Sequence, residues 1–170
     1  MKAVFGMDLQ VNLESFLDEK QYPERGLFKC RIVYDAATRE VTFTPYEARK
    51  VRRIKIVEDD RISYAHKFED RREINRLVDL RDDCDDVLII RKGHVTDCSY
   101  SNIVFRKGAV WYTPQTPLLN GTMREHLIEK SIIQPREIRL KDIRSFETFR
   151  IINAMLEFES PEIEVSDIVF

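Results

Sequence analysis

The chain has 170 residues, 43% of them hydrophobic and 34% charged, and its formal net charge is −2. This suffices for one compact domain or two small lobes with a core, and the near-neutral charge gives no general attraction to nucleic acid. The longest apolar runs, such as Val87–Ile90, are too short to cross a bilayer. No charged-then-apolar leader precedes Met7, so we expect a cytoplasmic protein without a membrane anchor.

The first part of the chain predicts a small lobe of one helix and antiparallel strands. An amphipathic helix is predicted over 12–17. The strand that follows has a predicted buried face of Phe28, Cys30, Ile32 and Tyr34. A second strand, marked by Val41 and Phe43, ends at Pro45, and Ile54 and Ile56 mark a third. The charged residues 58–60 make the best linker, so we expect two lobes over 1–58 and 59–170.

Residues 59–170 predict a mixed lobe in which strands lead into helix starts. Lys67 opens a predicted helical segment, in which Ile74, Leu77 and Val78 share one face. The other expected elements are strands over 87–90 and up to 97, a hairpin of 103–105 with 110–112, a helix over 121–130, a strand and short helix marked by Ile138, Ile143 and Phe146, and a strand over 149–152. The expected fold class is therefore α/β, of the α+β kind. The odd number of cysteines favours reduced thiols over disulfides. The spacing of the histidines matches no metal-ligand pattern, so we expect no metal site.

Four short motifs in the second lobe carry the functional signal. They are, in order, Gly93-His94-Val95-Thr96-Asp97, Ser101-Asn102, Thr113-Pro114 and Gly121-Thr122-Met123-Arg124. Taken singly, they are typical of a turn acid, a backbone-bonding corner and an ordinary helix start. Together with Lys67 they supply an amine, a carboxylate and an anion-binding helix start, which are the parts that a pyridoxal-phosphate site needs.

In this order, the motifs resemble those of the class IV aminotransferase family, the fold-type IV pyridoxal-phosphate enzymes. Family members carry Gly-x-Val-x-Glu-x-x-x-Ser/Ala-Asn, then Thr-Pro, then Gly-Ile-Thr-Arg or Gly-Ile-Met-Arg at a helix start. The resemblance covers residues 26–170 and implies two lobes of the D-amino acid aminotransferase-like fold, with the site in the cleft between them. The family's opening strand and helix, with Phe-Glu-Thr and His-x-x-Arg segments, have no match in this sequence, which implies a trimmed first lobe.

The resemblance also implies which lysine binds the cofactor. In the lyase-like branch this lysine stands in a Lys-x-x-Asn-Arg-Leu segment, and Lys67-Phe68-Glu69-Asp70-Arg71 keeps the Lys and the Arg at the matching distance before Asp97. A lone lysine at a helix start is otherwise an ordinary surface charge. The alternatives, Lys50 and Lys55, belong to strands of the other predicted lobe.

Further roles follow from the same resemblance. Asp97, one methylene shorter than the family's Glu, would pair with the ring nitrogen of pyridoxal phosphate beside the corner of Ser101 and Asn102. The cofactor phosphate would face Gly121, Thr122 and Met123 on one side and Asn153 and Ala154 on the other. Arg71 and Arg124 would support the site, with Arg124 bracing its loop rather than gripping phosphate.

Two single-position hints favour one activity within the family. Met123 matches the Gly-Ile-Met-Arg form, and Asn153-Ala154-Met155 resembles the Asn-Ala-Leu of 4-amino-4-deoxychorismate lyase. That lyase releases 4-aminobenzoate and pyruvate in folate biosynthesis. The alternatives are a branched-chain or D-amino acid aminotransferase, or a non-catalytic relic of the fold. The implied partners are a small-molecule amine substrate and a second copy of the chain in a homodimer.

Overall fold

The computed structural model describes residues 17, 23–35, 39–156 and 158–170. The chain forms two compact units, Met1–Ala48 and Arg49–Phe170. Apart from Leu17, the predicted helix over 12–17 lies outside the described residues. Within the described ranges, no helix has the length and apolar character needed to span a membrane.

The described part of the first unit is a β-hairpin. β1 (Phe28–Tyr34) pairs antiparallel with β2 (Arg39–Pro45), as the alternating pattern predicted. The predicted buried face of β1 is wrong in part, because Cys30 and Tyr34 are exposed while Phe28 and Ile32 are half-buried. A two-stranded sheet has too little area to bury one of its faces by itself, so alternation did not determine burial here.

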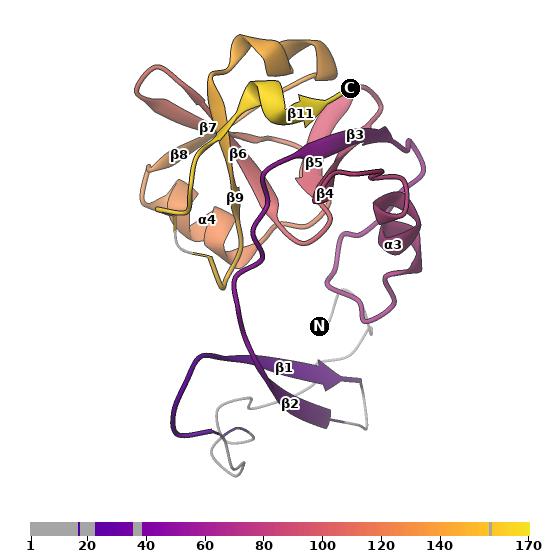
Figure 1. The fold of residues 1–170 in the computed structure, drawn as a ribbon, viewed down its shortest axis with the longest axis vertical. Coiled ribbons are helices and arrows are strands. Elements are labelled where there is room, and N and C mark those ends of the chain that lie inside the picture. Colours follow the sequence, from indigo (N-terminus) through magenta and orange to yellow (C-terminus); the bar gives the residue numbers. More distant parts are fainter. Residues whose placement is uncertain (1–16, 18–22, 36–38, 157) are drawn as a thin grey trace. The chain divides into compact units, whose positions relative to one another are not determined.

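The first sheet of the second unit has four strands in the order β11-β3-β4-β5 (Figure 1). They are β11 (Ile168–Val169), β3 (Ile54–Glu58), β4 (Asp86–Arg91) and β5 (His94–Cys98). β3 runs parallel to both β4 and β11, whereas β4 and β5 form an antiparallel hairpin. Lys92 and Gly93 make its turn with φ of 52° and 75°, and such left-handed backbone favours glycine.

The structure corrects the predicted place of β3 and, with it, the predicted boundary at residue 58. Ile54 is fully buried in the second unit, where it pairs with Asp86 of β4 instead of extending the β1–β2 hairpin. A parallel pair needs a long crossover connection, which residues 59–71 and α3 (Arg72–Val78) supply. The two compact units therefore divide before β3.

The second sheet has five strands in the order β10-β9-β6-β7-β8. They are β10 (Ile163–Glu164), β9 (Thr148–Ile152), β6 (Asn102–Lys107), β7 (Val110–Pro114) and β8 (Ile133–Arg136). α4 (Thr122–Glu129) connects β7 to the parallel β8. The strand expected near Ile138 lies earlier, at β8, and the expected short helix is the 3-10 helix η1 (Leu140–Ser145). A second 3-10 helix, η2 (Val165–Asp167), precedes β11.

Alternating side chains arrange these elements in four layers. Leu88 and Ile90 of β4 pack against the second sheet, whereas Val87 and Ile89 between them pack against α3. Across the second sheet, Val104 packs with Leu127 of α4. The order of layers is therefore α3, first sheet, second sheet, α4 (Figure 1). Each sheet contributes buried side chains from both of its faces. The predicted mixed α+β class is confirmed.

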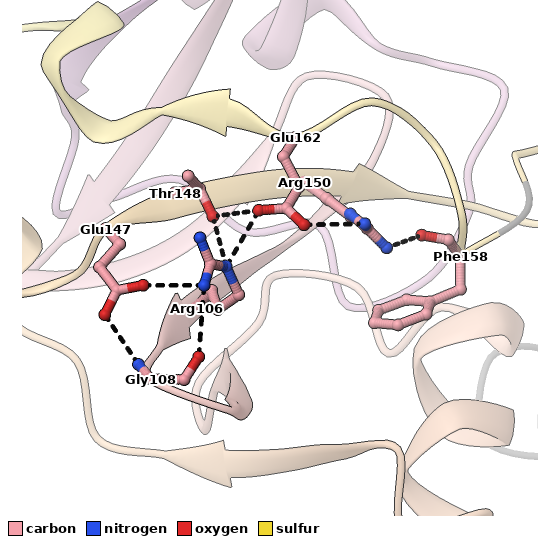
Figure 2. A network of polar contacts seen from close by, with 7 residues as sticks. All are labelled: Arg106, Gly108, Glu147, Thr148, Arg150, Phe158 and Glu162. Carbon is pink, nitrogen blue, oxygen red and sulfur yellow. Dashed lines mark hydrogen bonds and ion pairs between the residues drawn. The ribbon is translucent and has the colours of Figure 1, made fainter.

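A polar network fastens the segment before β10 to the second sheet (Figure 2). Arg106 on β6 donates from Nε to Thr148 at 3.1 Å and to Glu162 at 3.0 Å. Arg150 on β9 donates to the other Glu162 oxygen at 3.0 Å and to the Phe158 carbonyl at 2.7 Å. This network lies at one end of the β6–β9 pair, where Arg106 is opposite Thr148. The opposite end of the same pair is where β6 begins at Asn102.

Candidate functional site

A tight corner between β5 and β6 positions the first candidate residues. The Cys98 N–H donates to the Ser101 carbonyl at 2.9 Å, so the chain reverses over two residues. The reversal makes Asp97 on β5 and Asn102 on β6 neighbours. Asn102 Nδ2 donates to Asp97 Oδ1 at 2.7 Å. The short spacing in the sequence motif therefore corresponds to one local hydrogen-bonded turn.

The other oxygen of Asp97 is bound by the loop that follows β7. The backbone N–H groups of Leu118 and Leu119 donate to Asp97 Oδ2 at 2.8 and 2.9 Å. Asn102 Nδ2 also donates to the Leu119 carbonyl at 2.9 Å. Asp97 is only 5% exposed, and its buried carboxylate accepts hydrogen bonds from both the corner and the loop.

Burial dominates the electrostatics of Asp97. Loss of water raises the pKa of this carboxyl from 3.8 to about 6, although the Leu119 amide, Asn102, the Leu118 amide and the charge of Arg124 all act to lower it. Asp97 is thus ionised at neutral pH at an energetic cost, and a cation beside it would relieve that cost.

Arg124 braces the same loop from its far side. Its guanidinium donates to Asn120 Oδ1 at 2.7 Å, to the Pro114 carbonyl at 2.8 Å and to Thr113 Oγ1 at 3.3 Å. The side chain is buried, and that burial lowers its pKa. Through these contacts Arg124 is bound to its own loop.

Gly121 brings the start of α4 against the corner. It is the N-cap residue of α4, and no side chain caps this helix start within the described residues. A Cβ added at Gly121 would overlap Asn102 Oδ1, so only glycine fits this close approach. The first N–H groups of a helix have no intrahelical partner. Thr122, the first residue of α4, is exposed and Met123 is half-buried.

The turn after β9 reaches the same corner. Asn153 Nδ2 donates to Ser101 Oγ at 3.1 Å, while Asn153 Oδ1 accepts the Met155 N–H at 2.8 Å. Ser101 is buried and Ala154, at the tip of the turn, is exposed. The two segments that were predicted to face the phosphate, which begin at Gly121 and at Asn153, therefore both contact the β5–β6 corner.

Lys67 lies in an irregular segment, and the prediction that it opens a helix is wrong. α3 begins only at Arg72, whose N–H is accepted by Asp70 Oδ1 at 3.0 Å. This local carboxylate–amide bond sets the helix start later than the apolar period suggested. Lys67 is exposed and makes no hydrogen bond or ion pair with another described residue.

One side chain links the Lys67 segment to the corner. Arg71 donates from one terminal nitrogen to the Ser99 carbonyl at 2.6 Å, two residues beyond Asp97. The structure thus joins Asp97, Ser101, Asn102, Gly121 and Asn153 directly, and Lys67 only through its segment.

Sequence reasoning missed the amides of Leu118 and Leu119, because backbone donors leave no residue signature. It also missed Tyr64 and Tyr100, which contact Arg71.

Known proteins resemble this chain over most of its length. Residues 35–159 match the family model for amino-transferase class IV. An uncharacterized protein of Haemophilus influenzae is 43% identical over 144 residues, which are 85% of this chain and 77% of that protein. The crystal structure of a candidate 4-amino-4-deoxychorismate lyase from Haemophilus somnus is 40% identical, with a TM-score of 0.80 over 88% of this chain and 79% of its own.

A more distant solved structure shares the fold alone. It is the pyridoxal-phosphate-bound form of a hypothetical aminotransferase from Mycobacterium tuberculosis, 17% identical, with a TM-score of 0.60. The match covers 75% of this chain and 53% of that one.

Proposed function

This chain belongs to the class IV aminotransferase family, and we propose that it is a pyridoxal-phosphate enzyme in which Lys67 binds the cofactor and Asp97 pairs with its ring nitrogen. The observation that carries the proposal is the buried Asp97 carboxylate, held between the β5–β6 corner and the start of α4. A buried acid with a raised pKa beside an open helix start is typical of a functional site.

The bonding of Asp97 fits a ring nitrogen. A carboxylate offers about four lone-pair positions, two on each oxygen. The two loop amides occupy both positions on Oδ2, and Asn102 occupies one on Oδ1. Within the described part of the chain, one position on Oδ1 is left for an N–H donor. Because burial penalises the charge of Asp97, a protonated ring nitrogen is the kind of donor that this position favours.

The start of α4 fits a phosphate group. The unpaired N–H groups of its first turn and the helix dipole both favour an anion. We assign the phosphate to the amides of Gly121, Thr122 and Met123 and to the hydroxyl of the exposed residue Thr122. Ser101, Asn153 and Ala154 border the opposite side, where the Asn153–Ser101 hydrogen bond holds the two turns together.

The proposed chemistry assigns one task to each residue. When bound, pyridoxal phosphate supplies a ring that withdraws electrons from the carbon next to the substrate amine. Asp97 keeps the ring nitrogen protonated, which sustains that withdrawal. Lys67 holds the cofactor between turnovers and, once a substrate amine has taken its place, moves a proton at the reacting carbon.

Within the family we propose a 4-amino-4-deoxychorismate lyase, which releases 4-aminobenzoate and pyruvate. Support comes from the 40% identity to the candidate lyase of Haemophilus somnus and from Met123 and Asn153-Ala154. The second candidate, an amino acid aminotransferase, rests on the family match itself. Incubation with aminodeoxychorismate distinguishes them, because the lyase releases pyruvate without an amino acceptor, whereas an aminotransferase consumes 2-oxoglutarate.

We also propose that the protein is a homodimer. In the described part of the first unit, β1 and β2 pair only with each other, so each strand leaves an edge that another chain can cover. Sedimentation at micromolar concentration should give twice the chain mass of 20.2 kDa. A monomeric mass would contradict the proposal.

Covalent labelling tests the assignment of Lys67. Purified protein given pyridoxal phosphate should develop a visible absorption band, and borohydride should fix the label on the peptide that contains Lys67. Lys67→Ala should abolish the band, whereas Lys50→Ala, an exposed lysine in a similar irregular segment, should retain it. A label on Lys50 or Lys55, with Lys67→Ala unaffected, would refute the assignment.

A further inference from the structure

The segment that carries Lys67 depends on contacts from outside itself for its conformation. Residues 65–70 are all exposed and form neither helix nor strand. Such a segment samples many conformations unless side chains fasten it. A lysine that must meet one atom of a bound cofactor needs such fastening, because small errors in position reduce reactivity strongly.

Tyr64 fastens the first end of the segment. It is buried in the cluster that lies between α3 and the first sheet. Its hydroxyl donates to the Phe68 carbonyl at 2.7 Å and so closes the turn that contains Lys67. Within this turn the Phe68 N–H donates to the His66 carbonyl at 2.8 Å. The turn is thus anchored to the core at one point.

Arg71 fastens the second end, and it does so on the β5–β6 corner. One terminal nitrogen donates to the Ser99 carbonyl at 2.6 Å, and the other lies 3.4 Å from the Tyr64 hydroxyl. The guanidinium carbon lies 4.1 Å from the ring centre of Tyr100 and 5.6 Å from that of Tyr64. Ser99 is itself fixed, because its hydroxyl donates to the buried Asp86.

Arg71 is held at its terminal nitrogens while one of its donors stays unpaired within the described part of the chain, as is also true of Arg150 Nε. Its Nε is buried and has no hydrogen-bond partner among the described residues. Buried donors are almost always paired, and an unpaired one requires an explanation. Here the two terminal nitrogens and the ring contacts fix the guanidinium in a place where Nε finds no acceptor. Lysine has one point charge and no flat face, so it cannot make these contacts together.

We propose that Arg71 is a positioning residue that holds the Lys67 turn against the corner beyond Asp97, so that the amine and the carboxylate face one bound cofactor. This inference rests on the proposed function of Lys67. Arg71 acts through the backbone of its segment, with Tyr64 as the second fastening point, and contacts neither the cofactor nor the substrate.

The first test uses the protein without cofactor and compares Arg71→Gln with Arg72→Gln. Arg72 is the matched control because it is adjacent, its side chain is 89% exposed and its ion pair with Asp70 is local. Arg71→Gln should speed hydrogen exchange of the Phe68 amide, which donates to the His66 carbonyl, by about tenfold, and Arg72→Gln should not. Tyr64→Phe, which removes the hydroxyl bond to the Phe68 carbonyl and the longer contact with Arg71, should give a smaller increase.

The second test measures labelling of Lys67 by pyridoxal phosphate and borohydride in the same variants. Arg71→Gln should slow it by about tenfold at a temperature where the variant and the wild type are both folded, and Arg71→Lys should not restore it. Faster exchange with unchanged labelling would make Arg71 merely structural and overturn the inference, as would no change in either measurement. Labelling of a different lysine in the wild type would instead overturn the proposed function and, with it, this inference.

Discussion

Replacing Asp97 by Asn should change how the stability of the cofactor-free protein depends on pH. Burial raises the pKa of Asp97 from 3.8 to about 6 in the folded chain, so the folded state binds a proton more tightly than the unfolded state. The contribution of a raised pKa is fully present below the unfolded pKa and is lost as pH rises through the folded pKa. The full shift corresponds to about 3 kcal/mol.

Between about pH 4.5 and pH 7.5, the linkage relation gives a loss of about 2 kcal/mol from this one carboxyl. The free energy of unfolding in urea should therefore fall by about 2 kcal/mol more in the wild type than in Asp97→Asn over this interval. Comparing the two proteins cancels the other titrating groups. The exposed Asp79→Asn is the matched control and should follow the wild type. Equal slopes for wild type and Asp97→Asn would refute the account of Asp97 as a carboxylate ionised against its burial.

Two stability predictions follow from the loop that holds Asp97. Gly121→Ala should lower the free energy of unfolding by about 1–3 kcal/mol, because the added Cβ overlaps Asn102. The control Glu129→Ala, on the exposed side of α4, should change the free energy of unfolding by less than about 0.5 kcal/mol. Thermal and urea unfolding measure both variants, and equal values would contradict the close approach of Gly121 to Asn102. Arg124→Met should cost about 2–4 kcal/mol in the same assay, because the Pro114 carbonyl and Asn120 lose a buried partner; a neutral result would show that Arg124 does not brace the loop.

Local pattern in the sequence was enough to predict most elements of the second unit. The apolar run of β4, the turn at Gly93, the hairpin of β6 and β7 and the helix start at Gly121 each depend on neighbouring residues, and the structure has all four. The mixed α+β class followed from the same patterns, because a change of apolar period reflects the geometry of helix and strand directly.

Tertiary structure alone decided where β3 belongs and how the candidate site is built. The alternation of Ile54 and Ile56 predicts a strand but names no partner, and its parallel pairing with β4 depends on a crossover that no local pattern encodes. Likewise, the sequence identified Asp97 and Asn102 as candidates. The amides of Leu118 and Leu119 that hold Asp97, and the Ser99 carbonyl that accepts a hydrogen bond from Arg71, are backbone groups. Every residue carries the carbonyl, and every residue except proline carries the N–H. Their roles arise only when folding brings distant segments together.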